Sequence, residues 1–193
     1  MTLRQHGKWL ALRALMAIGI DLHLRTEDRR VLEQVLLPAL SADDRLQSIL
    51  FVGCDWYTRG YRRFFRGRSY VTLDIDPANR RCGAREHIVD ALQNLGHHVP
   101  VGSLDLILVN GVIGYGLDER ADIEAAFDAC LVALRPQGIL LLGWNDIAGR
   151  RPSRFDESTS LRGFEPMVLA PIGGSRIVTA TPNRHIFSFH LKA

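Results

Sequence analysis

The chain has 193 residues, a formal net charge of +3 and 47% hydrophobic residues. A chain of this size and composition can bury a substantial core, so its composition excludes a mainly disordered protein and does not require disulfides or metal for folding. We predict one domain, residues 1–193, with an N-terminal helical cap over 1–45 and an α/β core over 46–193.

The first forty residues have the apolar spacing of helices. Residues 8–20 place apolar side chains three and four positions apart. A second helix is expected to begin after Thr26 as N-cap and to end at Pro38 and the polar residues 41–44. Its apolar stripe consists of Val31, Leu32, Val35 and Leu36.

Short apolar runs then alternate with longer connections. Runs this apolar are typical of strands covered on both faces, as in a parallel sheet flanked by helices. The connections are long enough for crossovers between parallel strands. The expected strands are 48–52, 70–73, 87–89, 104–109 and 139–142.

The clearest helix precedes the fifth run. Asp118 is its expected N-cap, and residues 135–138 are expected to turn the chain into the strand. Its apolar face consists of Ile123, Ala126, Phe127, Cys130, Leu131 and Leu134. Two more β-type runs, one within 167–180 and one at 185–191, flank a turn at Pro182-Asn183.

Twenty-two of the 24 positive charges are arginines, and five of them lie between Arg59 and Arg68. Aromatic residues are interleaved with them, which predicts a crossover helix with a solvated arginine face. Contact with an anionic acceptor or with nucleic acid is the alternative, and the small net charge disfavours nucleic acid.

Polar residues follow the ends of the predicted strands, where ligands bind in doubly wound sheets. Asp74 comes 21 residues after Gly53, the spacing at which a carboxylate accepts the ribose hydroxyls of a nucleoside. Asp90 is placed to reach the exocyclic amine of an adenine lying along the strand ends. For each aspartate alone, the competing interpretation is a turn or a helix cap.

With its motifs in this order along the sequence, the chain resembles the class I S-adenosylmethionine-dependent methyltransferases. The resemblance covers 49–146 and rests on Gly53-Cys54, Leu73-Asp74-Ile75-Asp76, Val89-Asp90-Ala91, Asp105-Leu106-Ile107 and Leu134-Arg135-Pro136-Gln137-Gly138. It implies a doubly wound, mostly parallel seven-stranded sheet with a C-terminal antiparallel hairpin and N-terminal helices. The implied activity is methyl transfer from S-adenosylmethionine to a small-molecule acceptor, with oxygen slightly preferred over nitrogen and S-adenosylhomocysteine as product.

The resemblance also implies the residues of the site. The catalytic candidates are Tyr115 and Asp146. The cofactor-binding candidates are Gly53, Asp55, Tyr57, Asp74, Ile75, Asp90, Ala91 and Asn110. No role is assigned to the histidines, which are expected on the surface or satisfied in the core.

The first motif departs from the family pattern. Phe51 occupies the position of the usual acid, and Asp55 and Tyr57 stand where two further glycines are usual. Asp55 would compensate by pairing with the α-ammonium of the cofactor. The alternative is a catalytically inactive methyltransferase-like scaffold that acts through protein contacts. Without a G-x-G-x-x-G fingerprint, hydride transfer from a dinucleotide is disfavoured.

Three cysteines without a C-x-x-C pair predict no metal site and a reducing, cytoplasmic setting. The longest near-apolar run, residues 10–20, is too short to span a bilayer, so no membrane association is expected. The N-terminal helices could cover the acceptor pocket or form a homodimer contact, and both alternatives stay open.

Overall fold

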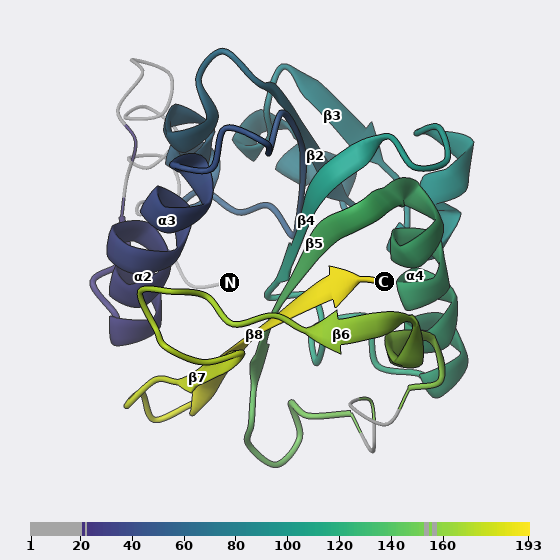
Figure 1. Cartoon of the computed structure of the whole chain (residues 1–193). Helices are drawn as coiled ribbons and strands as arrows, with labels where there is room; N and C mark the ends of the chain where they lie inside the picture. The colour runs from purple at the N-terminus through teal and green to yellow at the C-terminus, as the bar shows by residue number, and fades with distance from the viewer. Residues whose placement is uncertain (1–20, 22, 153–154, 156–157) are drawn as a thin grey trace.

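A computed structural model describes residues 21, 23–152, 155 and 158–193; the helix expected over 8–20 lies outside this part of the chain. It shows a sheet with helical segments on both faces (Figure 1). Seven strands follow the order β3-β2-β1-β4-β5-β8-β6, and β7 adds an eighth by pairing with β8. The strands are β1 (Ser48–Val52), β2 (Ser69–Asp74), β3 (Glu86–Val89), β4 (Leu104–Asn110), β5 (Leu134–Asn145), β6 (Phe164–Pro166), β7 (Arg176–Val178) and β8 (His185–Lys192).

The sheet confirms the predicted doubly wound architecture. Strands β1 to β5 are parallel, with β1 between β2 and β4, and β8 runs antiparallel to β5. The hairpin of β7 and β8 around the turn at 182–183 is also confirmed. The sequence pattern missed β6, which is only three residues long and pairs with the same edge of β8 as β7.

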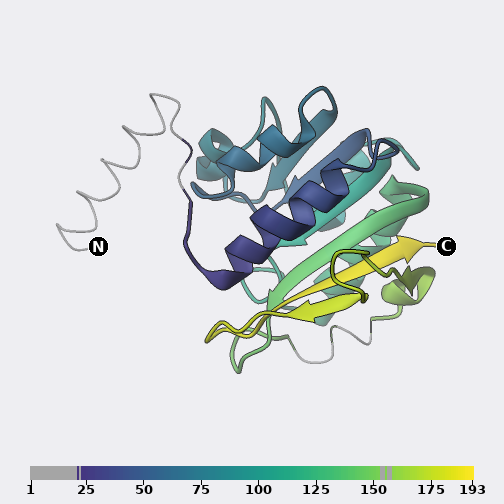
Figure 2. The same ribbon diagram turned by 60° about the vertical axis from the view of Figure 1, so that its left-hand side comes forward.

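Helical segments cover the two faces of the sheet separately (Figure 2). On one face lie α4 (Arg120–Ala133) and the 3-10 helix η4 (Leu92–His97). The other is covered by the N-terminal helices and the 3-10 helix η2 (Arg59–Phe65). A third 3-10 turn, η3 (Pro77–Cys82), joins β2 to β3, and η6 (Ser160–Gly163) precedes β6. All seven residues of β4 are buried between the two layers.

The N-terminal helical segment runs from α2 (Glu27–Val31) through a π-helical turn, η1 (Leu32–Leu36), into α3 (Leu37–Ser41). Its predicted stripe packs on the core, and Thr26 is the N-cap residue, without a side-chain capping bond. The helix ends at Ser41, within the expected polar residues 41–44, but the expectation that Pro38 ends it is wrong. Pro38 lies in the first turn of α3, where the missing N–H of proline is tolerated.

Three other boundaries differ from expectation. Glu119, not Asp118, is the N-cap of α4, and the Asp118 carboxylate instead accepts a bond from the Gly116 N–H. Residues 135–138 belong to β5, which begins where α4 ends and contains a bulge. The crossover after β1 is the short 3-10 helix η2, because residues 53–58 are used in the loop at the end of β1. It buries Tyr61 and Phe65 and leaves Arg62, Arg63 and Arg66 exposed.

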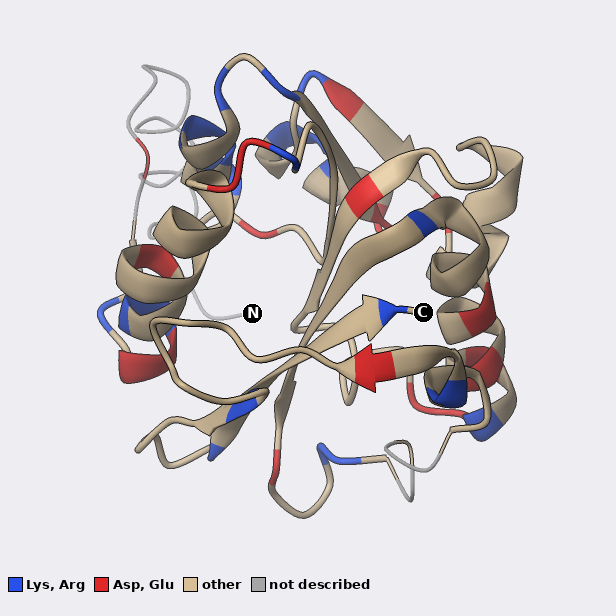
Figure 3. Ribbon diagram, in the orientation of Figure 1, with Lys and Arg blue, Asp and Glu red and all other residues tan. Residues whose placement is uncertain are grey.

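Basic and acidic residues are interspersed over the helices and loops in Figure 3. Within 21, 23–152, 155 and 158–193, no helix is both long and apolar enough to cross a bilayer.

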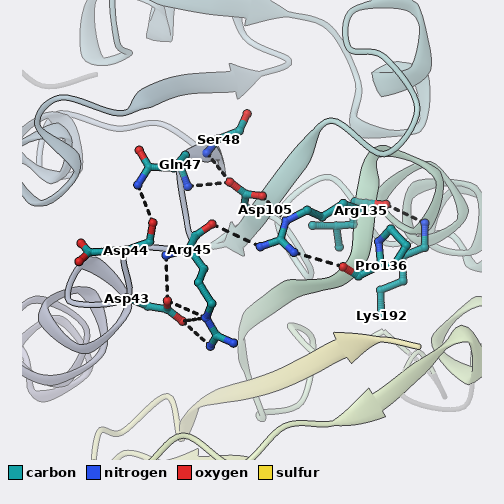
Figure 4. Close-up of polar contacts among 10 residues, drawn as sticks. Asp43, Asp44, Arg45, Gln47, Ser48, Asp105, Arg135, Pro136 and Lys192 are labelled. Carbon is teal, nitrogen blue, oxygen red and sulfur yellow. Dashed lines mark hydrogen bonds and ion pairs between the residues drawn. The ribbon is translucent and has the colours of Figure 1, made fainter.

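Asp105 joins three segments at the amino-terminal end of the parallel strands (Figure 4). Its Oδ2 accepts from the backbone N–H of Gln47 at 2.6 Å and of Ser48 at 2.8 Å. Its Oδ1 accepts from Nε of Arg135, whose Nη2 also reaches the carbonyl of Arg45. The arrangement explains the one polar residue in the apolar run of β4: the carboxylate anchors the start of β1 and of β5.

We expect Asp105→Ala to lower the free energy of unfolding by about 2 kcal/mol, because charge-assisted bonds and two backbone N–H partners are lost together. Chemical denaturation of the two proteins measures the difference. Asp44→Ala is the control, since its side chain is almost fully exposed and its contact with Arg68 is long, 3.4 Å. Equal losses in both variants would contradict the anchoring role.

Glu124 on α4 fixes the segment before β6. Its carboxylate accepts from the hydroxyl groups of Ser158, Thr159 and Ser160 and from two backbone N–H groups. These hydrogen bonds, led by that of Ser158, hold the pKa of Glu124 at about 2. The stabilisation is therefore present above the ordinary glutamate pKa near 4.5 and is lost as the pH falls toward 2.

Glu124→Gln is accordingly expected to lower the Tm at pH 7. The glutamine NH2 would face hydroxyl and backbone N–H groups that are themselves donors, so hydrogen bonds made by the carboxylate are lost. The deficit should shrink as the pH is lowered from 5 toward 3, where the wild-type carboxylate also begins to lose its advantage. Thermal unfolding of both proteins over this range tests it, and a deficit that does not change with pH would argue for a loss of packing instead.

Candidate functional site

A cavity of about 550 Å³ lies at the carboxyl ends of β1, β2, β3 and β4, extended by residues of α2 and β8. This is the size range of small-molecule sites. Nine of the ten residues predicted from the sequence line it, and Asp146 does not. The nine are Gly53, Asp55, Tyr57, Asp74, Ile75, Asp90, Ala91, Asn110 and Tyr115.

The loop after β1 begins with a backbone conformation that favours glycine. Gly53 has φ +92°, and a Cβ there would lie 2.5 Å from the carbonyl oxygen of Asn110. Its N–H donates to the Leu73 carbonyl, and the next N–H, of Cys54, donates to the Asp74 carboxylate at 2.6 Å. The loop is thus held closely between β2 and β4 although the family's other two glycines are absent.

Asp55 lies in this loop with one carboxylate oxygen available. Oδ1 accepts from the Trp56 N–H at 2.7 Å, whereas Oδ2 makes no hydrogen bond to the described residues. Burial raises the pKa of this carboxyl, which means that the charged form lacks full solvation. A cationic group entering the cavity would relieve that cost.

Both predicted nucleoside-binding aspartates also have structural partners. Asp74 accepts from the N–H groups of Cys54 and Asp76 and from the side chain of Asn79. Asp90 accepts from the Ala91 N–H, the Asn94 amide and His98. A carboxylate has about four acceptor positions, so each aspartate keeps about one for a ligand.

The opposite end of the cavity is built from four polar side chains, Asn110, His185, Asn145 and Tyr115, which we call the polar end. Nδ1 of His185 lies 2.7 Å from Oδ1 of Asn145, and its Nε2 lies 3.1 Å from Oδ1 of Asn110. The Asn145 amide donates to the Tyr115 hydroxyl at 2.6 Å. Burial lowers the pKa of His185 to about 4, so its ring is neutral at pH 7.

Gly143 on β5 makes room for the polar end. A Cβ at this position would lie 2.1 Å from Oδ1 of Asn110 and 3.1 Å from Nε2 of His185. His185 comes from β8, so the antiparallel pairing of β8 with β5 places the ring beside Asn145. The sequence analysis gave His185 no role, because nothing in the spacing of a late strand indicates which residue of β4 it meets.

Arg29 of α2 was also missed. Its side chain is buried, lines the cavity and lies with the guanidinium carbon 4.5 Å from the ring centroid of Tyr57. Its polar contacts are long, 3.5 Å to the Tyr61 hydroxyl and 3.4 Å to the Asp28 carboxylate, and Nη2 makes no hydrogen bond to the described residues. One buried cation in an otherwise apolar helix face was the available signal, and the general excess of arginine obscured it.

The fold is shared with many solved structures. The N-methyltransferase NodS from Bradyrhizobium japonicum WM9, in complex with S-adenosyl-L-homocysteine, aligns with a TM-score of 0.66 over 95% of this chain and 97% of that chain at 16% identity. The protein has the fold of the class I S-adenosylmethionine-dependent methyltransferases. A TehB-like S-adenosylmethionine-dependent methyltransferase from Corynebacterium glutamicum aligns with a TM-score of 0.60 over 98% of both chains at 17% identity.

A further methyltransferase-fold neighbour is the 1,6-didemethyltoxoflavin-N1-methyltransferase from Burkholderia thailandensis, with a TM-score of 0.55, 13% identity and coverage of 97% of this chain and 90% of that one. No protein-family model matches the sequence, and no curated protein matches it. The methyltransferase fold is thus evident from the structure at identities where sequence comparison finds nothing.

Within this methyltransferase fold, Asp146 is the one predicted residue that lies apart from the cavity. Its carboxylate pairs with Arg151 at 3.1 Å and with Arg184 at 3.6 Å, which ties the end of β5 to the segment before β8. The catalytic assignment of Asp146 therefore gains no support from its position.

Proposed function

We propose that this protein transfers a methyl group from S-adenosylmethionine to a small-molecule acceptor. The observation that carries the proposal is the pairing of charges in the cavity. The available Oδ2 of Asp55 and the available Nη2 of Arg29 suit the ammonium and the carboxylate of an amino acid moiety. Asp55 would thereby replace the acidic residue that is usual at the position of Phe51.

The other end of the cofactor has matching residues. Ile75 is apolar, lines the cavity and is 70% exposed, as expected of a side chain that packs on a planar ring. Asp74 and Asp90 beside it each keep about one acceptor position, for a ribose hydroxyl and an adenine amine respectively. Gly53 lets the backbone come close, since a side chain there would fill the space against Asn110.

When bound, the cofactor supplies an electrophilic methyl group on a sulfonium. The contribution of the chain is to hold both reactants in line and to exclude water, which can be worth about 7–11 kcal/mol. Tyr115 and the rest of the polar end lie in the same cavity and would face the acceptor. The slight preference for oxygen over nitrogen as the methylated atom stays a prediction; two of the structural neighbours are N-methyltransferases by name.

The second candidate is a methyltransferase-like scaffold without activity. It is favoured by one observation, that the chain's own N–H and amide groups already take most acceptor positions of Asp74 and Asp90. In that case these aspartates would serve only to shape the loops after β2 and β3.

Titration calorimetry with S-adenosylhomocysteine separates the two. We expect S-adenosylhomocysteine to bind and to raise the Tm. Both effects should be lost in the double variant Asp55→Asn, Arg29→Gln, because it removes the two charges that would pair with the amino acid moiety. Nicotinamide adenine dinucleotide is the control ligand and should give no heat. If neither S-adenosylmethionine nor S-adenosylhomocysteine gives heat or a thermal shift with the wild type, the enzyme proposal is wrong.

A further inference from the structure

The polar end forms a single chain of hydrogen bonds from the buried Asn110 to the half-exposed Tyr115 at the cavity wall. The ring of His185 connects two amides, and both amides present an oxygen to it. A neutral imidazole has only one N–H, so it cannot donate to both. One of the two amides must therefore turn its NH2 toward the ring. Which amide does so sets the donor and the acceptor of every hydrogen bond in this series.

Asn145 has a partner at each end of its amide, His185 at Oδ1 and Tyr115 at Nδ2. Asn110 does not, because its Nδ2 is buried and has no hydrogen-bond partner. Turning the Asn110 amide by 180° brings this NH2 to the free nitrogen of His185 and leaves Asn145 unchanged. Turning Asn145 instead would leave the buried Asn110 NH2 without a partner, whereas turning Asn110 leaves only its oxygen without one, and a buried oxygen without a partner is better tolerated than a buried N–H. The favoured arrangement therefore has Nδ1–H of His185 donating to Asn145 and Nε2 accepting from Asn110.

This arrangement decides the direction of the Tyr115 hydroxyl. Its oxygen accepts from the Asn145 NH2, so its own proton is free to point away from Asn145. The ring is held in place by Arg150, whose guanidinium carbon lies 4.3 Å from the ring centroid and whose Nη1 donates to the Gly114 carbonyl. Gly114 has no room for a side chain, since a Cβ would lie 1.8 Å from the Arg150 carbonyl oxygen.

We infer that His185 and Asn145 position the Tyr115 hydroxyl as a hydrogen-bond donor to the acceptor molecule. The acceptor then carries a hydrogen-bond-accepting oxygen or nitrogen, such as a carbonyl, at the place where it meets Tyr115. The inference rests on the proposed function, because it assigns the polar end to the acceptor and the rest of the cavity to the cofactor. His185 is a positioning residue, acting on the acceptor through Asn145.

The test uses two probes of the same shape, acetophenone and α-methylstyrene, in which a carbonyl oxygen is replaced by CH2. Binding of each to the protein saturated with S-adenosylhomocysteine is followed by ligand-observed NMR. We expect the ratio of the two affinities to fall about fivefold in Tyr115→Phe, the change that corresponds to one hydrogen bond of about 1 kcal/mol. Taking the ratio removes the general difference in hydrophobicity between the probes.

Asn145→Asp separates positioning from a merely structural role. It keeps the tyrosine and the shape, but a carboxylate only accepts, so the Tyr115 proton should turn toward it and the preference for the ketone should be lost as in Tyr115→Phe. His190→Gln is the matched control, because His190 is the other histidine of β8, is partly buried, contacts Ser188 through a hydrogen bond and does not line the cavity. It should leave the ratio unchanged.

Two results would overturn the inference: a ratio that Tyr115→Phe leaves unchanged, or a ketone preference that survives in Asn145→Asp. Failure of the proposed function is recognised separately, because S-adenosylhomocysteine would then not bind the wild type. In that case the probes are added to the protein alone, and the same comparison of variants decides whether the hydroxyl is presented as a donor.

Discussion

Asp74→Ala is expected to weaken the binding of S-adenosylhomocysteine at least tenfold. The substitution removes the remaining acceptor position for a ribose hydroxyl, and a hydrogen bond to a charged group is worth about 1.5–3 kcal/mol. It also releases the Cys54 N–H, which donates to Asp74 at 2.6 Å and holds the loop that carries Asp55. Both losses act on the same ligand, so the effect should exceed that of any other single substitution in the cavity.

Titration calorimetry measures this affinity, and Asp105→Ala is the matched control. Asp105 is likewise a buried aspartate that accepts two backbone N–H bonds, but it lies at the opposite end of the parallel strands. Asp105→Ala should lower stability and leave the affinity within about twofold. An Asp74→Ala protein that binds as tightly as the wild type would show that the ribose is bound elsewhere.

Gly53→Ala is expected to cause the largest loss of stability among the cavity substitutions. Its φ of +92° is unfavourable for alanine, and the new Cβ would lie 2.5 Å from the Asn110 carbonyl oxygen and 2.7 Å from Cγ2 of Val112. Strain of this kind and overpacking each cost about 1–3 kcal/mol, so we expect a loss of about 2–4 kcal/mol in the free energy of unfolding and a tenfold or greater loss of cofactor affinity.

Gly67→Ala separates the two costs. Gly67 also has a positive φ, +81°, but a Cβ there would meet nothing within 4 Å. Its variant should therefore show only the conformational cost, about 1 kcal/mol, with unchanged cofactor affinity. Chemical denaturation and calorimetry on both variants measure the difference, and equal losses would mean that β1 and β4 move apart without difficulty at this point.

The pattern of apolar runs was sufficient for the order and type of the main strands. Strands β1 to β4 end within a residue of their predicted ends, because each apolar run stops where polar residues begin. Short elements were less visible. The three residues of β6 carry no period, and the identity of the N-cap of α4 depends on backbone geometry that Asp118 and Glu119 do not reveal by type.

The residues of the candidate site also fall into those that could be predicted from the sequence and those that could not. The side chains that line the cavity after β1, β2 and β3 come close after their own strands in sequence, so their positions could be inferred from spacing along the chain. At the polar end, Asn110 and Tyr115 were among the predicted residues, but their connection through His185 could not be inferred. Strand β8 reaches β5 by an antiparallel return, and its register alone places His185 against Asn145. Arg29 enters the cavity only through the packing of α2 on the sheet.

The parallel core, the cavity residues Gly53, Asp74 and Asp90, and the resemblance to the class I methyltransferases were thus predictable from the sequence. These features can be predicted because the burial of a strand and its end are both recognisable from the types of residues that are adjacent in the sequence. Three features became known only from the three-dimensional structure: Asp146 is paired with arginines, Asp74 and Asp90 have hydrogen-bond partners within the protein, and His185 and Arg29 line the cavity. The contacts of Cys54 with Asp74, of Arg184 with Asp146 and of His185 with Asn145 join segments far apart in the chain, and the fold as a whole sets the register and packing that create them. The partners of Asp90 are near it in sequence, and those contacts depend on the local backbone conformation.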